Sequence, residues 1–178
     1  SFGGAYWVWM LILVSFVLQA VAYEFQAKPG NVLGRDCYRR FLVFNGVVGP
    51  FVVGAAVATF FTGSNFLVTH DALGLGVADA GPVISRWGNA WHGLDALFCP
   101  WNWVLGLAVV FLTRVLGSLY LLNNLHDEEL RPRLRRQVLI DTVPFLVLFI
   151  AFVGRVLTAT GLVSDAATQT FAPEAYTH

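Results

Sequence analysis

Charge is scarce in this sequence of 178 residues, and the scarcity narrows the class of protein at once. Only 12% of the residues are charged, about half of the roughly 25% that is usual in soluble domains. Hydrophobic residues make up 57% of the chain, and the mean hydropathy is +0.65. This composition excludes a disordered chain and an ordinary soluble enzyme, and it indicates a polytopic membrane protein.

Net charge and cysteine are lacking as well. Eleven basic and eleven acidic residues give a formal net charge of zero, so the chain has no strongly basic domain and we expect no nucleic-acid partner. Two cysteines are too few for a secreted disulfide scaffold.

Motifs that carry chemistry are also missing. The sequence contains no CxxC or HExxH motif and no Gly-rich phosphate-binding loop. A membrane cytochrome holds haem through His or Met side chains on its helices. Here all four histidines lie outside the long apolar stretches, and the one methionine is Met10. We therefore expect no catalytic residue, no metal ligand and no cofactor bound by this chain alone.

The chain does contain four apolar stretches, each long enough to cross a bilayer, which needs about 20 residues. The approximate ranges are 5–25, 41–61, 101–122 and 138–160, with a long outer loop over 62–100. The stretches are apolar nearly all round, which is typical of membrane helices rather than of helices with one polar face. We predict an all-α polytopic membrane protein, a single domain over residues 1–178 whose four transmembrane helices form all or part of a helix bundle.

The orientation of these helices follows from the basic residues of the short loops. Loops 26–40 and 123–137 hold eight of the eleven basic residues, whereas the outer loop holds only Arg86. Because cytoplasmic loops are enriched in Lys and Arg, we predict that both basic loops face the cytoplasm. Cys37 and Cys99 are then about 30 Å apart across the hydrocarbon, too far for a disulfide, and are expected to be free thiols.

An internal repeat is suggested by sliding the chain along itself by 94 positions. The shift aligns Trp7 with Trp101 and Pro50 with Pro144. A true repeat would relate two helix pairs of the same orientation. Chance matching between two apolar helices is the alternative.

Polar side chains inside the predicted spans are the candidate functional residues, because ionisable groups are costly within a membrane. The set is Gln19, Glu24, Asn45, Arg114, Asp141 and Arg155. Glu24 and Asp141 are expected near the cytoplasmic boundary and Arg155 near the outer one, where such side chains reach towards water. Gln19, Glu24, Arg114 and Asp141 are the proton-path candidates, and a purely structural role is the alternative.

Arg114 is the deepest of these charges, about 20 Å from Trp101 at 1.5 Å per residue, and Gln19 is placed at nearly the same depth. Side chains tilt towards the N-terminus of their helix, so Arg114 is expected to point outwards, away from Glu24 and Asp141. Our hypothesis is that Arg114 is buried in protein and contacts Gln19, or else a carboxylate of a partner subunit.

Small residues mark the second span. Gly46, Gly49, Gly54 and Ala58 predict close helix packing. Asn45, next to them, is expected to form a hydrogen bond to a neighbouring helix.

Three long segments carry a resemblance to a known family. They are WVWMLILVSFVLQAVAYEFQ (7–26), NGVVGPFVVGAAVATFFTGSNF (45–66) and NAWHGLDALFCPWNWVLGLAVVFLTRVLGSLYLLNN (89–124). The sequence resembles subunit II of the bacterial cytochrome bd quinol oxidases over nearly its whole length. Glu24 matches an acidic position of the family, but Gln19 stands where many members have Arg.

The resemblance implies a haem-free subunit of a quinol:oxygen oxidoreductase in the bacterial cytoplasmic (inner) membrane. Its partner would be the haem-bearing subunit I, which also oxidises the quinol. Subunit II would scaffold this partner and assist proton conduction, and in some members it holds a structural quinone or lipid. Ser1 stands directly before a span, without an initiator Met, so we expect a chain cut out of a longer one. The resemblance implies that it is the central part of subunit II.

A module of a small membrane transporter or channel is the alternative function. Such a protein would also be a polytopic bundle with buried charge, and broken helices beside a binding site would favour it. Proline can break a helix, and Pro50 and Pro144 lie inside two of the apolar stretches. The sequence therefore leaves the transporter or channel alternative open.

Overall fold

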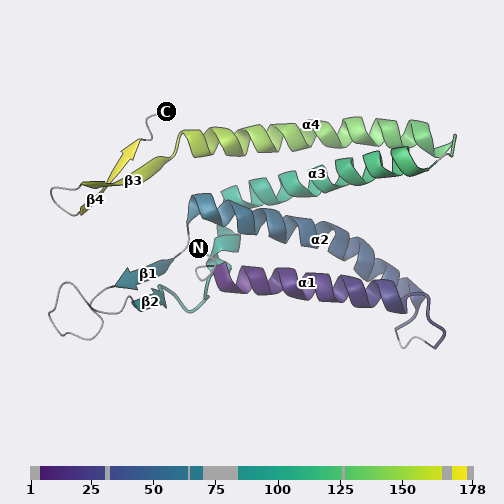
Figure 1. The fold of residues 1–178 in the computed structure, drawn as a ribbon, viewed down its shortest axis with the longest axis horizontal. Helices are drawn as coiled ribbons and strands as arrows, with labels where there is room; N and C mark the ends of the chain where they lie inside the picture. Colours follow the sequence, from purple (N-terminus) through teal and green to yellow (C-terminus); the bar gives the residue numbers. More distant parts are fainter. Residues whose placement is uncertain are drawn as a thin grey trace.

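The computed structural model describes residues 5–30, 33–63, 65–69, 84–125, 127–165 and 170–175. Its main elements are the helices α1 (Tyr6–Phe25), α2 (Arg35–Thr62), α3 (Pro100–Asn124) and α4 (Leu130–Leu157) (Figure 1). All four helices are long and apolar enough to cross a membrane. The predicted all-α class with four candidate membrane spans is confirmed.

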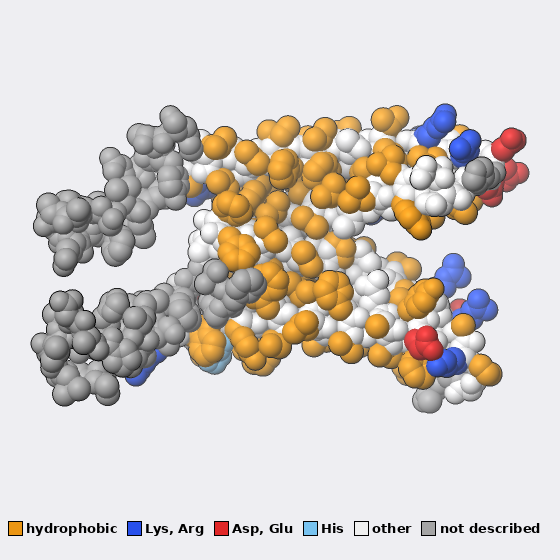
Figure 2. Space-filling model, viewed as in Figure 1, with side chains coloured by type: hydrophobic (Ala, Val, Ile, Leu, Met, Phe, Trp, Pro, Cys, Tyr) orange, Lys and Arg blue, Asp and Glu red, His pale blue; other side chains and the backbone are white. Residues whose placement is uncertain are grey.

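Short elements lie at one end of the helices (Figure 1). They are the antiparallel pair β1 (Phe66–Thr69) and β2 (Ile84–Trp87), the 3-10 helix η2 (Leu94–Phe98), and the antiparallel pair β3 (Thr160–Asp165) and β4 (Thr170–Ala175). We call this the hairpin end: α1 and α3 begin there, and α2 and α4 end there. The opposite end is the basic end, because the blue Lys and Arg side chains gather there in Figure 2.

Two helices begin earlier than hydropathy predicts. α2 starts at Arg35 and α4 at Leu130, not at residues 41 and 138. At the start of α4 the Asp127 carboxylate accepts hydrogen bonds from the backbone N–H groups of Glu129 (2.9 Å) and Leu130 (3.4 Å). Such a cap satisfies donors that the first turn of a helix leaves free. Hydropathy locates the apolar part of each helix, and each of these two helices extends beyond it into charged residues.

Consecutive helices form the extensive contacts, α1 with α2, α2 with α3, and α3 with α4. α1 and α4 are therefore the edges of a row (Figure 1). α2 is the most enclosed of the four and α4 the least. Orange apolar side chains cover the visible middle of the molecule in Figure 2, so these helices leave wide apolar faces for lipid or for further protein.

Glycines allow α2 and α3 to meet backbone to backbone. A Cβ on Gly54 would lie 2.8 Å from the Cα of Gly106, and a Cβ on Gly106 would lie 2.9 Å from the carbonyl oxygen of Phe51. Real Cβ atoms do not approach other atoms this closely, so only glycine fits at either position. The predicted close packing at Gly54 is confirmed, with α3 as the neighbour.

The other small residues of α2 divide into two groups. Ala58 is fully buried, and a Cβ on Gly49 would lie 3.1 Å from Ser15 Oγ on α1. A Cβ on Gly46 would meet nothing within 4 Å. The packing prediction is therefore correct for Gly49 and Ala58 and wrong for Gly46, which lies on an open part of the helix surface.

The helix boundaries repeat along the chain. α3 begins 94 residues after α1, and α4 begins 95 residues after α2. Pro50 and Pro144 lie within α2 and α4, and both helices are assigned as unbroken elements. The offset suggested by the sequence thus relates two helical hairpins of the same direction.

Candidate functional site

An ion pair joins α3 and α4 within their apolar lengths. Arg114 Nε donates to Asp141 Oδ2 at 3.1 Å, and Gln137 Nε2 donates to the same oxygen at 2.8 Å. The Asp141 side chain is 3% exposed, whereas that of Arg114 is 51% exposed. A buried carboxylate requires such partners. The outer part of the guanidinium therefore faces away from these four helices while its Nε holds Asp141.

The predicted pairing of Arg114 with Gln19 is wrong. α3 and α4 run antiparallel, and Arg114 lies ten residues before the end of α3 while Asp141 lies eleven residues after the start of α4. Both are therefore about 15 Å from the basic end at 1.5 Å per residue. The sequence measured the depth of Arg114 from Trp101 and that of Asp141 from residue 138, at opposite ends of the spans, and so did not place the two at one level.

A second polar cluster joins α1 and α2. Ser15 Oγ donates to Asn45 Oδ1, and Asn45 Nδ2 donates to Gln19 Oε1 at 2.8 Å. Ser15 and Asn45 are buried, whereas Gln19 is exposed. The predicted hydrogen bond from Asn45 to a neighbouring helix is confirmed, and its partners include the Gln19 that had been assigned to Arg114.

Glu24 belongs to neither cluster. Its Oε1 lies 2.6 Å from Lys28 Nζ, four residues further along the chain, and both side chains are more than half exposed. Lys28 also lies over the ring of Phe25, 5.1 Å from its centre. Water screens an exposed pair of this kind, so it adds little to stability. Of the four proton-path candidates, the structure brings together only Arg114 and Asp141.

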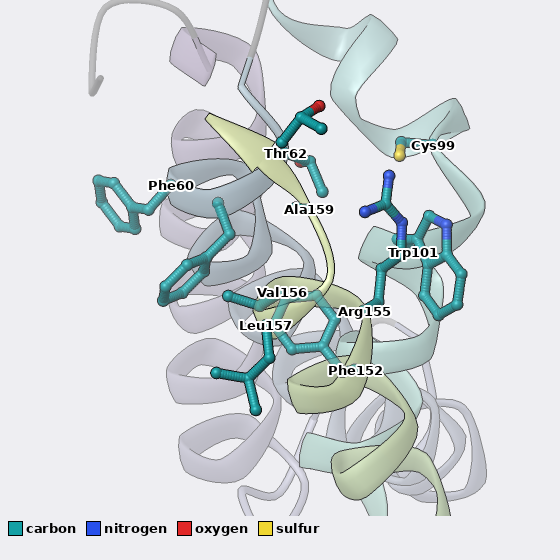
Figure 3. Close-up of a pocket in the computed structure, with 11 residues that line it drawn as sticks. Phe60, Thr62, Cys99, Trp101, Phe152, Arg155, Val156, Leu157 and Ala159 are labelled. Atoms are coloured by element: carbon teal, nitrogen blue, oxygen red, sulfur yellow. The ribbon is translucent and has the colours of Figure 1, made fainter. Parts of the chain in front are cut away.

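A cavity of about 570 Å³ opens at the hairpin end between α2, α3 and α4. Arg155 in the last turn of α4 lines it, and its guanidinium lies 5.8 Å from the centre of the Trp101 ring. Figure 3 shows this guanidinium directed towards Cys99 and Trp101. Tryptophan is enriched where membrane helices meet the aqueous boundary, and Trp101 stands in the first turn of α3 beside this cavity.

The residues that could ligate a metal lie apart from one another in the described part of the chain. Within it, no group of three or more His, Cys, Asp or Glu residues is arranged to hold a metal ion. His92 packs edge-on against Trp87, with ring centres 4.6 Å apart. The other three histidines, at 70, 126 and 178, lie outside the described residues. Cys37 and Cys99 are both free, as expected.

Gln137 and Ser15 take part in the two polar clusters but were not among the predicted candidates. Gln137 had been assigned to a loop, although its spacing of four residues from Asp141 places both on one helix face. Ser15 stands inside the first apolar stretch and is not among the predicted polar candidates. The spacing of Gln137 from Asp141 can be interpreted only when the start of the helix is known. The hydroxyl of Ser15 can be interpreted only when the neighbouring helix is known.

The fold and its polar clusters define a polytopic helical membrane protein whose charges lie between helices and at helix ends. The four spans are continuous, whereas a transporter site is typically flanked by broken helices. The chain matches a family model described as cytochrome bd terminal oxidase subunit II over residues 1–175. No relative among the curated proteins matches it. The chain belongs to the cytochrome bd terminal oxidase subunit II family and is a subunit of that oxidase complex, which implies a partner, subunit I.

Proposed function

We propose that this chain is a haem-free part of subunit II that scaffolds the haem-bearing subunit I of a bacterial quinol:oxygen oxidoreductase. The half-exposed Arg114 carries the proposal. A guanidinium inside the hydrocarbon costs at least about 2.5 kcal/mol at the bilayer centre even on a lenient scale. Within the described residues only Asp141 pairs with it, so the exposed part of Arg114 is expected to meet further protein of the assembly.

The polar clusters support a structural role first. Asp141 takes two hydrogen bonds, and Asn45 takes part in two, so each cluster fixes one pair of neighbouring helices. We also propose that Asp141 and Arg114 assist proton conduction, because they lie together within the membrane-spanning lengths of α3 and α4. Gln19 and Glu24 would contribute from α1, the first six residues before its end and the second one residue before it.

The proposed location is the bacterial cytoplasmic membrane, with loops 26–40 and 123–137 on the cytoplasmic side. Membrane lipid covers the remaining apolar faces, and a structural quinone or lipid is held by the subunit in the assembled oxidase. The partner subunit supplies the haems and the quinol-oxidising site.

Co-purification of the tagged full-length protein tests the proposal. A haem-bearing partner should be recovered in equal amount with an oxidase spectrum, and the subunit separated from this partner should show no Soret band. Arg114→Leu should lower the recovery of the partner, whereas Arg133→Leu, an exposed arginine at the basic end, should not. A stoichiometric Soret band kept by the separated subunit would contradict the haem-free assignment.

Proton conduction is tested with Asp141→Asn in the assembled oxidase. The variant keeps the shape of the side chain but removes its charge. If the cluster conducts protons, the oxidase should assemble with its normal spectrum while proton uptake during turnover slows. Normal uptake in an assembled Asp141→Asn oxidase would leave the structural role alone.

A further inference from the structure

A recess of about 480 Å³ lies on α2 near the basic end. It is lined by Asp36, Arg39, Arg40, Val43 and Phe44, all of them exposed. Among the described residues, neither arginine forms an ion pair. Two positive side chains against one negative give the recess a net positive charge. Val43 and Phe44 are 68% and 66% exposed, so a wide apolar surface adjoins this charge.

The recess lies on the side of α2 that faces α3. Residues three, four or seven apart share one face of a helix, and such steps connect Arg40 to Phe44, Phe44 to Phe51 and Phe51 to Gly54. Phe51 and Gly54 are the residues of α2 that approach Gly106 on α3. The lining residues therefore continue the contact face of α2 towards the basic end.

α2 and α3 separate from each other along this face. They meet at Gly54 and Gly106 and diverge towards the basic end (Figure 1), and Figure 2 shows the two helical hairpins standing apart there. On α3 a Cβ at Gly117, three turns after Gly106, would meet nothing within 4 Å, and Tyr120 is 69% exposed. We call this space the wedge: it is closed at the glycines, has Phe44 and Tyr120 on its two walls, and opens at the arginines.

We propose that a phospholipid with an anionic headgroup occupies the wedge. Its phosphate contacts Arg39 and Arg40, because a guanidinium matches the oxygens of a phosphate group, and an acyl chain extends past Phe44 towards the glycine contact. Basic pockets between membrane helices bind anionic lipid headgroups in this way. The proposal rests on the proposed membrane location, and it uses none of the polar clusters to which the scaffold and proton roles are assigned.

Charge and shape favour this occupant over others. A lipid with one negative charge neutralises the recess, whereas a zwitterionic lipid or a quinone leaves its net positive charge in place. A helix of a partner subunit is about 10 Å wide, so it cannot follow the wedge to the point where two helices meet backbone to backbone. A flexible acyl chain can narrow the space to that point.

Photo-crosslinking in the intact oxidase tests the site. Phospholipids with glycerol, ethanolamine or choline headgroups and the same diazirine-bearing acyl chain are exchanged into the purified complex and illuminated, and the crosslinked peptides are identified by mass spectrometry. The anionic glycerol lipid should label the peptides that contain Phe44 or Tyr120 about fivefold more than the two zwitterionic lipids do. Fivefold corresponds to about 1 kcal/mol, the contribution of one basic charge near a membrane surface.

Variants separate the charges of the recess. Replacing both arginines, Arg39→Gln with Arg40→Gln, should remove the fivefold preference, whereas Arg133→Gln, at an exposed arginine near the start of α4, should keep it. Asp36→Asn removes the one negative charge and should raise the preference for the anionic lipid by a similar factor. A purely structural role of Asp36 predicts no such gain, so this variant decides the matter if the double arginine variant does not assemble.

Recovery of the haem-bearing partner is measured on the same samples, so that a failure of the lipid site is distinguished from a failure of the scaffold role. Equal labelling by the three lipids would overturn the proposal, as would a preference for the ethanolamine lipid that Asp36→Asn abolishes. Absence of lipid labelling at Phe44 and Tyr120 in an assembled oxidase would show that protein fills the wedge, and would overturn it too.

Discussion

Arg114 on α3 and Asp141 on α4 form an ion pair, 3.1 Å between Nε and Oδ2, in which the acid is 3% exposed and the base 51%. The pair is therefore asymmetric: the carboxylate belongs to the interior of the helix row, and the guanidinium belongs to its surface. Gln137, one turn before Asp141, donates to the same oxygen. Asp141 thus keeps one neutral partner even when Arg114 is removed.

Removing one partner of the ion pair should lower the stability more than removing both partners. Arg114→Leu leaves a buried carboxylate with only Gln137 beside it. Removing one partner of a buried pair typically costs 3–5 kcal/mol, and we expect about 3 kcal/mol because Arg114 is half exposed. The double variant Arg114→Leu, Asp141→Leu removes both charges, and should recover most of that loss. Thermal unfolding of the purified complex measures the difference.

Arg133→Leu is the matched control for this series, because Arg133 is an exposed arginine near the start of α4. Its melting temperature should equal that of the unchanged protein. A double variant no more stable than Arg114→Leu alone would show that the ion pair does not account for the loss.

The contact between α2 and α3 should depend on two glycines. Gly106→Ala places a Cβ 2.9 Å from Phe51, so the helices must separate or Phe51 must move. Overpacking of this kind costs about 1–3 kcal/mol. Gly106→Ala should therefore lower the melting temperature and the yield of the assembled complex.

Gly117→Ala provides the control on the same helix, because a Cβ at Gly117 meets nothing within 4 Å. It should leave stability unchanged or raise it slightly, since alanine favours the helix. Equal losses for both variants would mean that helix propensity or expression, and not the close approach at Gly106, explains the effect.

The spans were predictable from the sequence because hydropathy measures the property that a bilayer requires of a spanning helix. Apolar runs of about 20 residues are what a bilayer requires, and each predicted run lies almost wholly within one observed helix. The helix starts were not predictable in this way. Arg35 and Leu130 begin their helices among charged residues, where the chain lies outside the hydrocarbon and hydropathy carries no signal.

The error at Arg114 lay in the alignment of α3 with α4. The sequence measured each residue from one end of its own span, Arg114 from Trp101 and Asp141 from residue 138. In the structure Arg114 lies ten residues before the end of α3 and Asp141 eleven residues after the start of α4, so the two meet. Which polar residues meet depends on the register between antiparallel helices, and that register is set by helix ends and by the short connection between α3 and α4. Neither the composition of a span nor its length determines this register.

The Ser15–Asn45–Gln19 cluster should contribute a modest stabilisation. Asn45→Ala removes two side-chain hydrogen bonds between α1 and α2. Such bonds average about 0.6 kcal/mol each in membrane proteins, so the expected loss is about 1 kcal/mol, measured as a lower melting temperature. Asn124→Ala is the control, since Asn124 bonds only to a carbonyl of its own helix and should lose less. A loss above about 3 kcal/mol would indicate that Asn45 has a further role.

The orientation in the membrane is the last prediction, and it depends on the basic end. Loops 26–40 and 123–137 hold eight of the eleven basic residues, and positively charged short loops stay on the cytoplasmic side. Single cysteines at Arg39, Arg135 and Ala90 are introduced after Cys37 and Cys99 are replaced by serine and alanine. An impermeant maleimide should label the Ala90→Cys variant in intact cells, and should reach the other two only after the membrane is opened. Leu116→Cys, on the exposed apolar surface of α3, should stay unlabelled in both states. Residues 79 and 168 are also expected on the outer side, but they lie outside the described part of the chain. If the reagent labelled the Arg39→Cys variant and not the Ala90→Cys variant in intact cells, the orientation would be the opposite of the predicted one.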